Sequence, residues 1–181
     1  MGRAYERYLK ETLIDEQTLQ RRVAELGQII SADYTEEDNL LLICILKGGV
    51  MFLTDLTRHM DVPHEIDFMS IASYGKGQRH STKHVRIDMD LKSHLENRHV
   101  LIVEDIIDSG HTLHFVLSML EARRPADIRL CTLLDKPSRR EVNIQVDYVG
   151  FEIEDKFVFG YGLDLDEKFR NLPFIGVANL G

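Results

Sequence analysis

The sequence has few cysteines and no cysteine pattern. Its 181 residues contain two, Cys44 and Cys131, and each lies inside an apolar segment, LLLICIL or IRLCTLL. A cysteine in such a segment usually serves as a small buried apolar side chain. We therefore expect neither a disulfide framework nor a cysteine metal site, and the reducing cytoplasm is the expected location.

Long apolar runs are also missing. No run approaches the roughly 20 residues that a helix needs to cross a bilayer. The first ten residues, MGRAYERYLK, are charged and lack the apolar centre of a secretory signal. We expect no membrane partner.

Positive charge is scarce. The chain has 22 Lys and Arg against 30 Asp and Glu, a formal net charge of −8. Non-specific nucleic-acid binding needs clustered cations, so we expect no nucleic-acid partner. Small phosphorylated ligands stay possible, because backbone amides, a few cations and a bridging metal ion can hold them.

The composition that is present fits one globular domain over residues 1–181, with 44% apolar and 29% charged residues. Continuous apolar runs predict buried strands at residues 40–46, 99–105 and 128–135. Apolar periodicity predicts helices in the segment capped by Asp15, at residues 50–60 and at residues 112–123. We also expect a long hairpin from strands 65–75 and 85–91, short strands at 147–151 and 156–160, and a helical turn at 166–171.

Buried strands that alternate with helices indicate an α/β fold, a mainly parallel sheet flanked by helices. Ligands of such sheets bind outside the carboxyl ends of the strands. The loops to consider therefore follow Leu46, Asp105 and Asp135.

The segment IDSGHTL joins a predicted strand to a predicted helix and could hold an anion on its backbone amides. An ordinary turn, with Ser109 or Thr112 as helix N-cap, is an equally good interpretation of this segment alone. Glu104 and Asp105 precede it. At the end of a strand both can turn toward the ligand crevice, and we favour this interpretation over the alternative of a solvated acidic turn.

An apolar strand followed by Glu-Asp-x-x-Asp-Ser-Gly-x-Thr resembles the phosphoribosyl pyrophosphate signature of the type I phosphoribosyltransferases. The resemblance runs from about Leu40 to Asn171 and is closest to the hypoxanthine-guanine branch of that family. It implies the type I fold, with a small hood and a flexible hairpin loop that begins near Ser73 and Tyr74. It also implies ribose and phosphate binding by Glu104, Asp105, Ile106, Ile107, Asp108, Ser109, Gly110, His111 and Thr112.

The same resemblance implies roles for the other loops. Pyrophosphate would contact Lys47, Gly48 and Arg170, and the peptide before Lys47 is often cis in the family. The purine would contact Lys136, Lys156, Phe157, Val158 and Asp164, and Mg²⁺ would be held near Glu104, Asp105 and Asp164. Without the resemblance, Lys47 and Arg170 would be taken as surface cations and Phe157 as a core aromatic.

One departure concerns His111, at a position where relatives often have Lys or Leu. His111 and His114 could suggest a metal pair, but two surface histidines are the simpler interpretation.

The resemblance implies purine salvage: magnesium-dependent transfer of phosphoribose from phosphoribosyl pyrophosphate to hypoxanthine or guanine, giving IMP or GMP, with Asp108 as the base. Two alternatives stay open. One is a regulator of this fold that binds nucleotides and nucleic acid, and the other is a transferase for xanthine or uracil. Relatives form homodimers or homotetramers, and the sequence does not rank hypoxanthine against guanine.

Overall fold

A six-stranded sheet forms the centre of the protein. The structure is a computed structural model that describes residues 3–74 and 84–179. The strand order is β4-β3-β2-β5-β6-β7, and every neighbouring pair is parallel except β3 and β4. The strands are β2 (Leu40–Leu46), β3 (His64–Tyr74), β4 (His84–Met89), β5 (His99–Ile107), β6 (Asp127–Asp135) and β7 (Tyr148–Glu152). The predicted mainly parallel sheet is confirmed.

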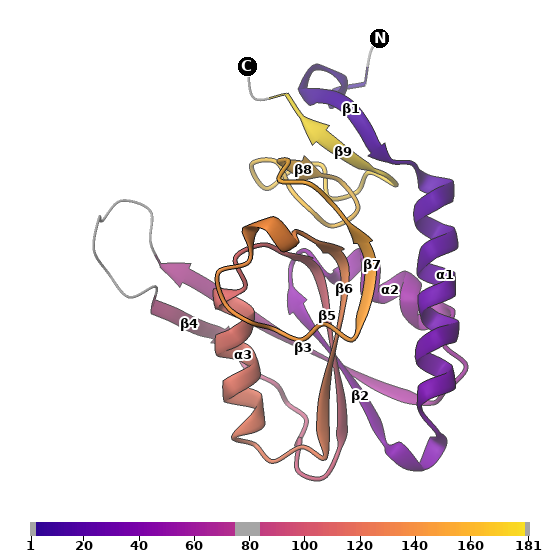
Figure 1. Cartoon of the computed structure of the whole chain (residues 1–181), viewed down its shortest axis with the longest axis vertical. Helices are drawn as coiled ribbons and strands as arrows, with labels where there is room; N and C mark the ends of the chain where they lie inside the picture. The colour runs from indigo at the N-terminus through magenta and orange to yellow at the C-terminus, as the bar shows by residue number, and fades with distance from the viewer. Residues whose placement is uncertain (1–2, 75–83, 180–181) are drawn as a thin grey trace.

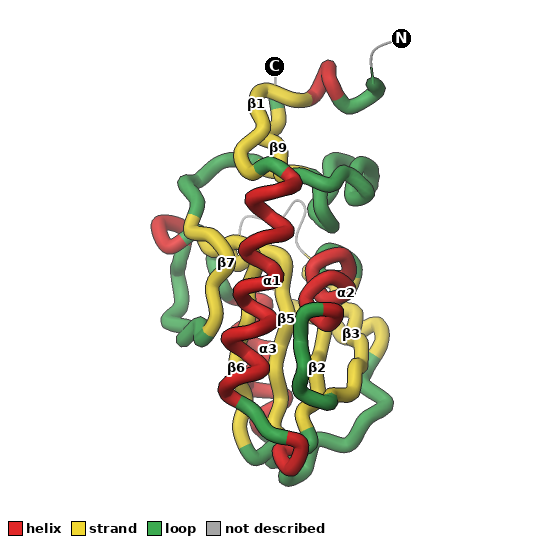
Figure 2. The backbone as a smooth tube through the Cα atoms, turned by 90° about the vertical axis from the view of Figure 1, so that its right-hand side faces the viewer, coloured by secondary structure: helices red, strands yellow, loops and turns green. Residues whose placement is uncertain are grey.

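Helices cover both faces of this sheet. Helices α1 (Glu16–Asp33) and α2 (Val50–Arg58) lie on one side and α3 (His111–Glu121) lies on the other (Figures 1 and 2). Strand β2 is buried almost throughout because alternate residues face the two helical layers. Leu42 packs with α1 and α2, whereas its neighbour Ile43 packs with α3. The double burial explains why LLLICIL is a continuous apolar run.

Helix α1 begins where the sequence predicts. Asp15 is its N-cap, and its carboxylate accepts a hydrogen bond from Thr18 N at 2.8 Å. The buried stripe Leu19, Val23, Leu26 and Ile30 is the predicted one. Helix α3 ends at Glu121, two residues before the predicted end. Short 3₁₀ turns occur at Glu6–Tyr8, Glu36–Asp38 and Pro137–Arg139.

A second, three-stranded antiparallel sheet stands above the carboxyl ends of the main strands (Figure 1). Its order is β1-β9-β8, from β1 (Leu9–Ile14), β9 (Ile175–Ala178) and β8 (Val158–Phe159). Strands β1 and β9 were not predicted. Leu9 pairs with Ala178 and Ile14 with Ile175, so the two ends of the described chain lie together in this hood.

The predicted helical turn at residues 166–171 is wrong. The chain instead makes a tight hairpin turn in which Leu165 and Lys168 exchange backbone hydrogen bonds at 3.0 and 3.2 Å. The central residues Asp166 and Glu167 have φ of 53° and 62°. Positive φ at both central positions is the geometry of a type I′ turn, which excludes a right-handed helix there. The predicted strand at 156–160 is likewise reduced to Val158–Phe159.

The long hairpin is confirmed in its stems. Strands β3 and β4 pair antiparallel, from Ser70 with Met89 to Tyr74 with His84. Ser73 and Tyr74 are the last residues of β3, and the remainder of the expected flexible loop, residues 75–83, lies outside the described residues. In the described part, no helix has the length and apolarity to span a membrane.

Candidate functional site

Three loops meet at the carboxyl ends of neighbouring strands. Strand β5 lies between β2 and β6, so the loops after Leu46, Ile107 and Asp135 are adjacent. The backbone ties two of them together, since Lys136 N donates to Ile107 O at 3.0 Å. Most of the residues expected to bind the ligand therefore reach one edge of the sheet, beneath the hood.

The LKGG loop after β2 packs directly on β5 and on the hood. The Leu46–Lys47 peptide is cis, as the family resemblance implies. A Cβ atom on Gly48 would overlap the Asp105 carboxylate, and a Cβ on Gly162 would overlap Gly48 O. Only glycine permits so close an approach at these positions. The contacts place the pyrophosphate loop between the end of β5 and the hood.

Glu104 and Asp105 do not turn to the same side. Strand β5 continues to Ile107, beyond the predicted end at Asp105, so the two side chains alternate across the sheet. Glu104 lines a hollow of about 200 Å³ together with Asp108, Ser109 and Thr112, whereas Asp105 packs against Gly48. The solvated acidic turn is therefore wrong, and so is the expectation that both carboxylates turn together.

Burial shapes the chemistry of this pair. Desolvation raises the pKa of both the Glu104 and the Asp105 carboxyl groups. Asp105 Oδ1 accepts a hydrogen bond from Ile106 N at 2.9 Å. Glu104 Oε2, in contrast, is buried without a hydrogen-bond partner from the described residues. A buried acceptor without a partner marks a place where a ligand hydroxyl or a cation would be stabilising.

The turn before α3 leaves backbone amides free for an anion. Gly110, with φ of 87°, is the N-cap, and no side chain among the described residues caps this helix. The alternative in which Ser109 or Thr112 caps α3 is therefore wrong. The uncapped amides of the first turn and the helix dipole both favour a negative group in the hollow that Ser109 and Thr112 line.

Lys136 and Asp108 face each other across the ends of β6 and β5. The buried Lys136 ammonium lies 4.0 Å from Asp108 Oδ2 and 3.5 Å from Asp155 Oδ1. Arg139 Nε donates to Asp108 Oδ1 at 3.0 Å and lies 3.7 Å from Asp155 Oδ2. Arg139 and Asp155 were not predicted as site residues. Their nearness in sequence to predicted site residues could have indicated them: Arg139 follows Lys136 in DKPSRR, and Asp155 precedes Lys156 in EDKF.

The hood supplies an aromatic side chain at the same edge. The Phe157 side chain is half exposed, at 50%, whereas Val158 beside it is buried in β8. A core aromatic would be buried, so this alternative for Phe157 is wrong. Lys156 does not join Lys136: its ammonium pairs with Glu11 at 3.3 Å and Glu154 at 3.4 Å.

Arg170 lies among the acidic groups of the hood. Its guanidinium donates to Gly162 O at 2.7 Å and pairs with Asp164 at 2.9 Å. Arg170 also lowers the pKa of the nearby Asp105, although burial has the larger and opposite effect. Lys47 pairs with Glu167 at 2.8 Å. The two cations expected to bind pyrophosphate are thus linked to one hood segment, residues 164–170.

The described residues hold no group of three or more His, Cys, Asp or Glu that could bind a metal ion. His111 pairs with Glu141 at 2.7 Å, and His114 lines the hollow between α3 and β6. Magnesium commonly uses only one or two protein carboxylates and takes its other ligands from substrate phosphates and water. Asp105 and Asp164, which interact electrostatically, fit that donor set, whereas the expected third member, Glu104, lies on the other side of β5.

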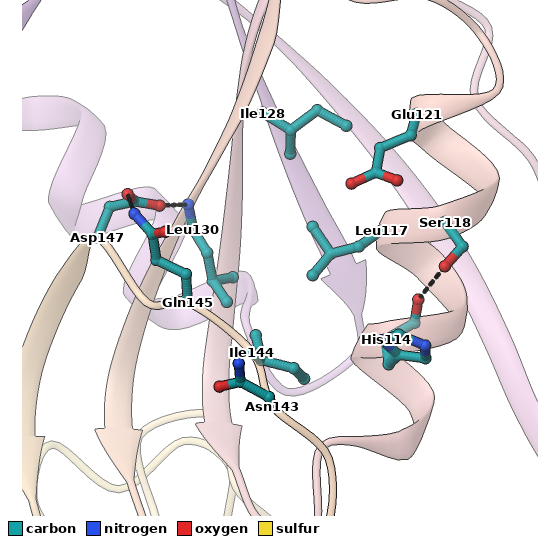
Figure 3. A pocket seen from close by; sticks show the side chains of 10 residues that line it. All are labelled: His114, Leu117, Ser118, Glu121, Ile128, Leu130, Asn143, Ile144, Gln145 and Asp147. Carbon is teal, nitrogen blue, oxygen red and sulfur yellow. Dashed lines mark hydrogen bonds between the residues drawn. The ribbon is translucent and has the colours of Figure 1, made fainter.

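A separate hollow of about 370 Å³ lies between α3, β6 and the segment before β7 (Figure 3). Its lining includes Glu121, Asp147 and His114 but no lysine or arginine. Asp147 is already engaged, since it accepts hydrogen bonds from Leu130 N and Gln145 Nε2. This hollow shares no residue with the predicted site and does not suit a phosphate group.

Comparison with known proteins identifies the family that the sequence motifs resemble. Residues 11–168 match the family model of the phosphoribosyl transferase domain. The hypoxanthine phosphoribosyltransferase of Haemophilus influenzae is 50% identical over 169 residues, which cover 92% of this chain and 93% of that protein. The hypoxanthine phosphoribosyltransferase of Escherichia coli K12 is 47% identical over 167 residues, with 92% and 93% covered.

A solved structure of a hypoxanthine phosphoribosyltransferase from Staphylococcus aureus has the same fold. It superimposes with a TM-score of 0.93 at 43% sequence identity, covering 99% of this chain and 96% of that one. The match extends over the hood as well as the main sheet. On these grounds the chain belongs to the phosphoribosyltransferase family.

Proposed function

We propose that this protein is a purine-salvage enzyme that transfers phosphoribose from phosphoribosyl pyrophosphate to N9 of hypoxanthine or guanine. The C1–O bond of the donor breaks and pyrophosphate leaves, while a C1–N9 bond forms and gives IMP or GMP. The purine loses one proton from its imidazole ring. The names and similarity of the relatives support this choice of substrates.

The observation that carries the proposal is the position of Lys136. A buried ammonium group is costly unless it has partners. Among the described residues, this one has two half-exposed carboxylates within 4.0 Å, those of Asp108 and Asp155. It is therefore set to donate a hydrogen bond to a neutral acceptor that enters between Asp108 and the hood. The 6-oxo group of hypoxanthine or guanine is such an acceptor, whereas the 6-amino group of adenine is a donor.

The site divides into three parts that fit the three parts of the nucleotide. Lys47, Gly48 and Arg170 would bind pyrophosphate, and the turn from Asp108 to Thr112 would bind the 5′-phosphate. Glu104, which lines the same hollow as that turn, would address the ribose hydroxyls, whereas Asp105 lies on the pyrophosphate side, next to Gly48. Phe157 would stack on the base, and the backbone of Val158 would meet its N1 and C2 edge.

The charges that form in the transition state determine what each side chain contributes to catalysis. Bond breaking at C1 places positive charge on the sugar and negative charge on the leaving pyrophosphate. Lys47 and Arg170 would stabilise the leaving group because they are positioned before the reaction begins. Asp108 is the base that takes or shares the proton at N7 of the purine. Its hydrogen bond from Arg139 fixes the orientation of the carboxylate.

Mg²⁺ is the proposed cofactor. The Asp105 and Asp164 carboxylates would hold it together with oxygens of the donor. Magnesium bound there would neutralise part of the negative charge of the diphosphate.

We also propose that residues 1–181 act as one domain, located in the cytoplasm, that assembles as a homodimer or homotetramer and binds neither nucleic acid nor membrane. The test of the function is direct. The protein is mixed with Mg²⁺ and phosphoribosyl pyrophosphate, each nucleobase is offered in turn, and the nucleotide products are separated. IMP or GMP is the expected product; product from xanthine or uracil alone, or no product, would contradict the proposal.

A further inference from the structure

The Glu167 carboxylate joins the two cations that are proposed to bind pyrophosphate. Its Oε2 atom lies 2.8 Å from Lys47 Nζ, and its Oε1 atom lies 3.4 Å from Arg170 Nη2. Within residues 3–74 and 84–179, Lys47 has no other ion pair. A single carboxylate thus contacts both of the proposed pyrophosphate cations.

The backbone holds Glu167 in place. It is the second central residue of the tight turn closed by Leu165 and Lys168, and its φ is 62°. Its N–H donates to Asp164 Oδ2 at 2.8 Å. The turn therefore fixes the Glu167 backbone beside the two cations. The Glu167 side chain is exposed, and an exposed glutamate is negatively charged at neutral pH.

The chemistry of this contact resembles that of a bound anion. A carboxylate offers two oxygens to the cations, much as one phosphoryl group of pyrophosphate would. Pyrophosphate carries more charge than a carboxylate and can also contact the Gly48 backbone, so it should win the competition. The side chains of Lys47 and Glu167 are 68% and 66% exposed, which makes their ion pair weak and reversible.

We propose that Glu167 is an internal competitor of pyrophosphate, which occupies Lys47 and Arg170 in the unliganded protein and returns to them as pyrophosphate leaves. The inference rests on the proposed function, because that function places pyrophosphate at these cations. Glu167 would then set the affinity of the site for the donor and for the released product. It would take no part in the transfer itself.

The direction of the effect separates this role from two others. If Glu167 competes with pyrophosphate, its neutralisation strengthens binding. If Glu167 positions Lys47 for the ligand, neutralisation weakens binding. If the ion pair is incidental, binding does not change.

The test compares Glu167→Gln with Asp166→Asn by titration calorimetry with inorganic pyrophosphate and Mg²⁺. Asp166 is the matched control, since it is an exposed acid on the same turn and has no ion pair within the described residues. It lines a different hollow, with Tyr8 and Phe169. Both variants remove one negative charge from the turn, but only Glu167→Gln removes the ion pairs with Lys47 and Arg170.

We expect Glu167→Gln to bind pyrophosphate about two- to fivefold more tightly than the wild type, the range that an exposed ion pair allows. In the transfer assay its KM for phosphoribosyl pyrophosphate and its inhibition constant for pyrophosphate should fall by the same factor. Asp166→Asn should stay close to the wild type. Adding Glu167→Gln to a Lys47→Gln protein should produce a smaller gain, because one of the two competing contacts is already lost.

Unchanged or weaker binding by Glu167→Gln would overturn the proposal, and so would an equal gain in Asp166→Asn, which would indicate a general charge effect. Failure of the proposed function would look different. In that case the wild type would bind no pyrophosphate and would form no nucleotide from any base.

Discussion

The Nζ atom of Lys136 lies 4.0 Å from Oδ2 of Asp108, across the gap between the ends of β6 and β5. The two groups face the same space from neighbouring parallel strands, whose register pairs Ile107 with Asp135. A purine placed there would meet an ammonium at its 6-position and a carboxylate at its imidazole ring. In the proposed function Lys136 selects the base and Asp108 takes its proton, so each residue has its own prediction.

Asp108→Asn should reduce turnover severely while donor binding changes little. An amide keeps the shape of the side chain but cannot take the N7 proton, and general bases contribute about 10²- to 10⁴-fold. The measurements are kcat for hypoxanthine and the dissociation constant of phosphoribosyl pyrophosphate. Turnover close to that of the wild type would remove Asp108 from the role of base.

Lys136→Ala should weaken the selection of 6-oxopurines. The variant loses the hydrogen-bond donor that favours an oxo group, so we expect kcat/KM for hypoxanthine to fall by about tenfold or more while the value for adenine changes little. Parallel assays with the two bases give the ratio. Equal losses for hypoxanthine and adenine would contradict this assignment.

Asp155→Asn tests whether the partner of Lys136 matters. The Asp155 side chain is 53% exposed, so solvent screens its interaction and only a modest effect is expected. We expect KM for hypoxanthine to rise about two- to fivefold. The KM for phosphoribosyl pyrophosphate serves as the internal control, because Asp155 contacts none of the proposed pyrophosphate ligands. A change of the same size in both KM values would mean that Asp155 acts on the whole fold.

Asp15→Ala should lower the melting temperature by about 2–4 °C, since it removes the N-cap of α1. Activity should change little, because the Asp15 side chain bonds to Thr18 and not to a proposed site residue. The hydrogen bond from Thr18 N lowers the pKa of Asp15. A carboxyl group with a lowered pKa stabilises the fold above its unfolded pKa and loses that effect as the pH falls through its folded pKa. The advantage of the wild type over Asp15→Ala should therefore be complete above about pH 5 and shrink as the pH falls through about 4 and below. A constant difference across this range would contradict the capping role of the ionised side chain.

Local sequence signals were enough to predict the main sheet and its loops. Continuous apolar runs such as LLLICIL revealed buried strands because both faces of β2 are covered, and Asp15 followed by a 3.6-residue periodicity marked α1. The motifs at residues 46–49, 104–112 and 155–164 lie on segments that the structure brings together. These features depend on neighbours in sequence, which a sequence pattern can record.

The missed features depend on contacts between distant residues. Strand β1 has no apolar alternation, and it is a strand because Leu9 pairs with Ala178, far along the chain. The turn at Asp166 and Glu167 has two left-handed residues without the glycine or asparagine that usually marks such a turn. Arg139 and Asp155 join the site only because the ends of β5, β6 and the hood meet there.

The most direct test of the central claim, that this site transfers phosphoribose selectively to 6-oxopurines, is the ratio of kcat/KM for hypoxanthine to that for adenine. Both values are measured on the wild type with phosphoribosyl pyrophosphate and Mg²⁺. A site that hydrogen-bonds a specific polar group can reject an analogue by about 10⁴-fold or more, and we predict a ratio of that order. Comparable values for the two bases would contradict the account.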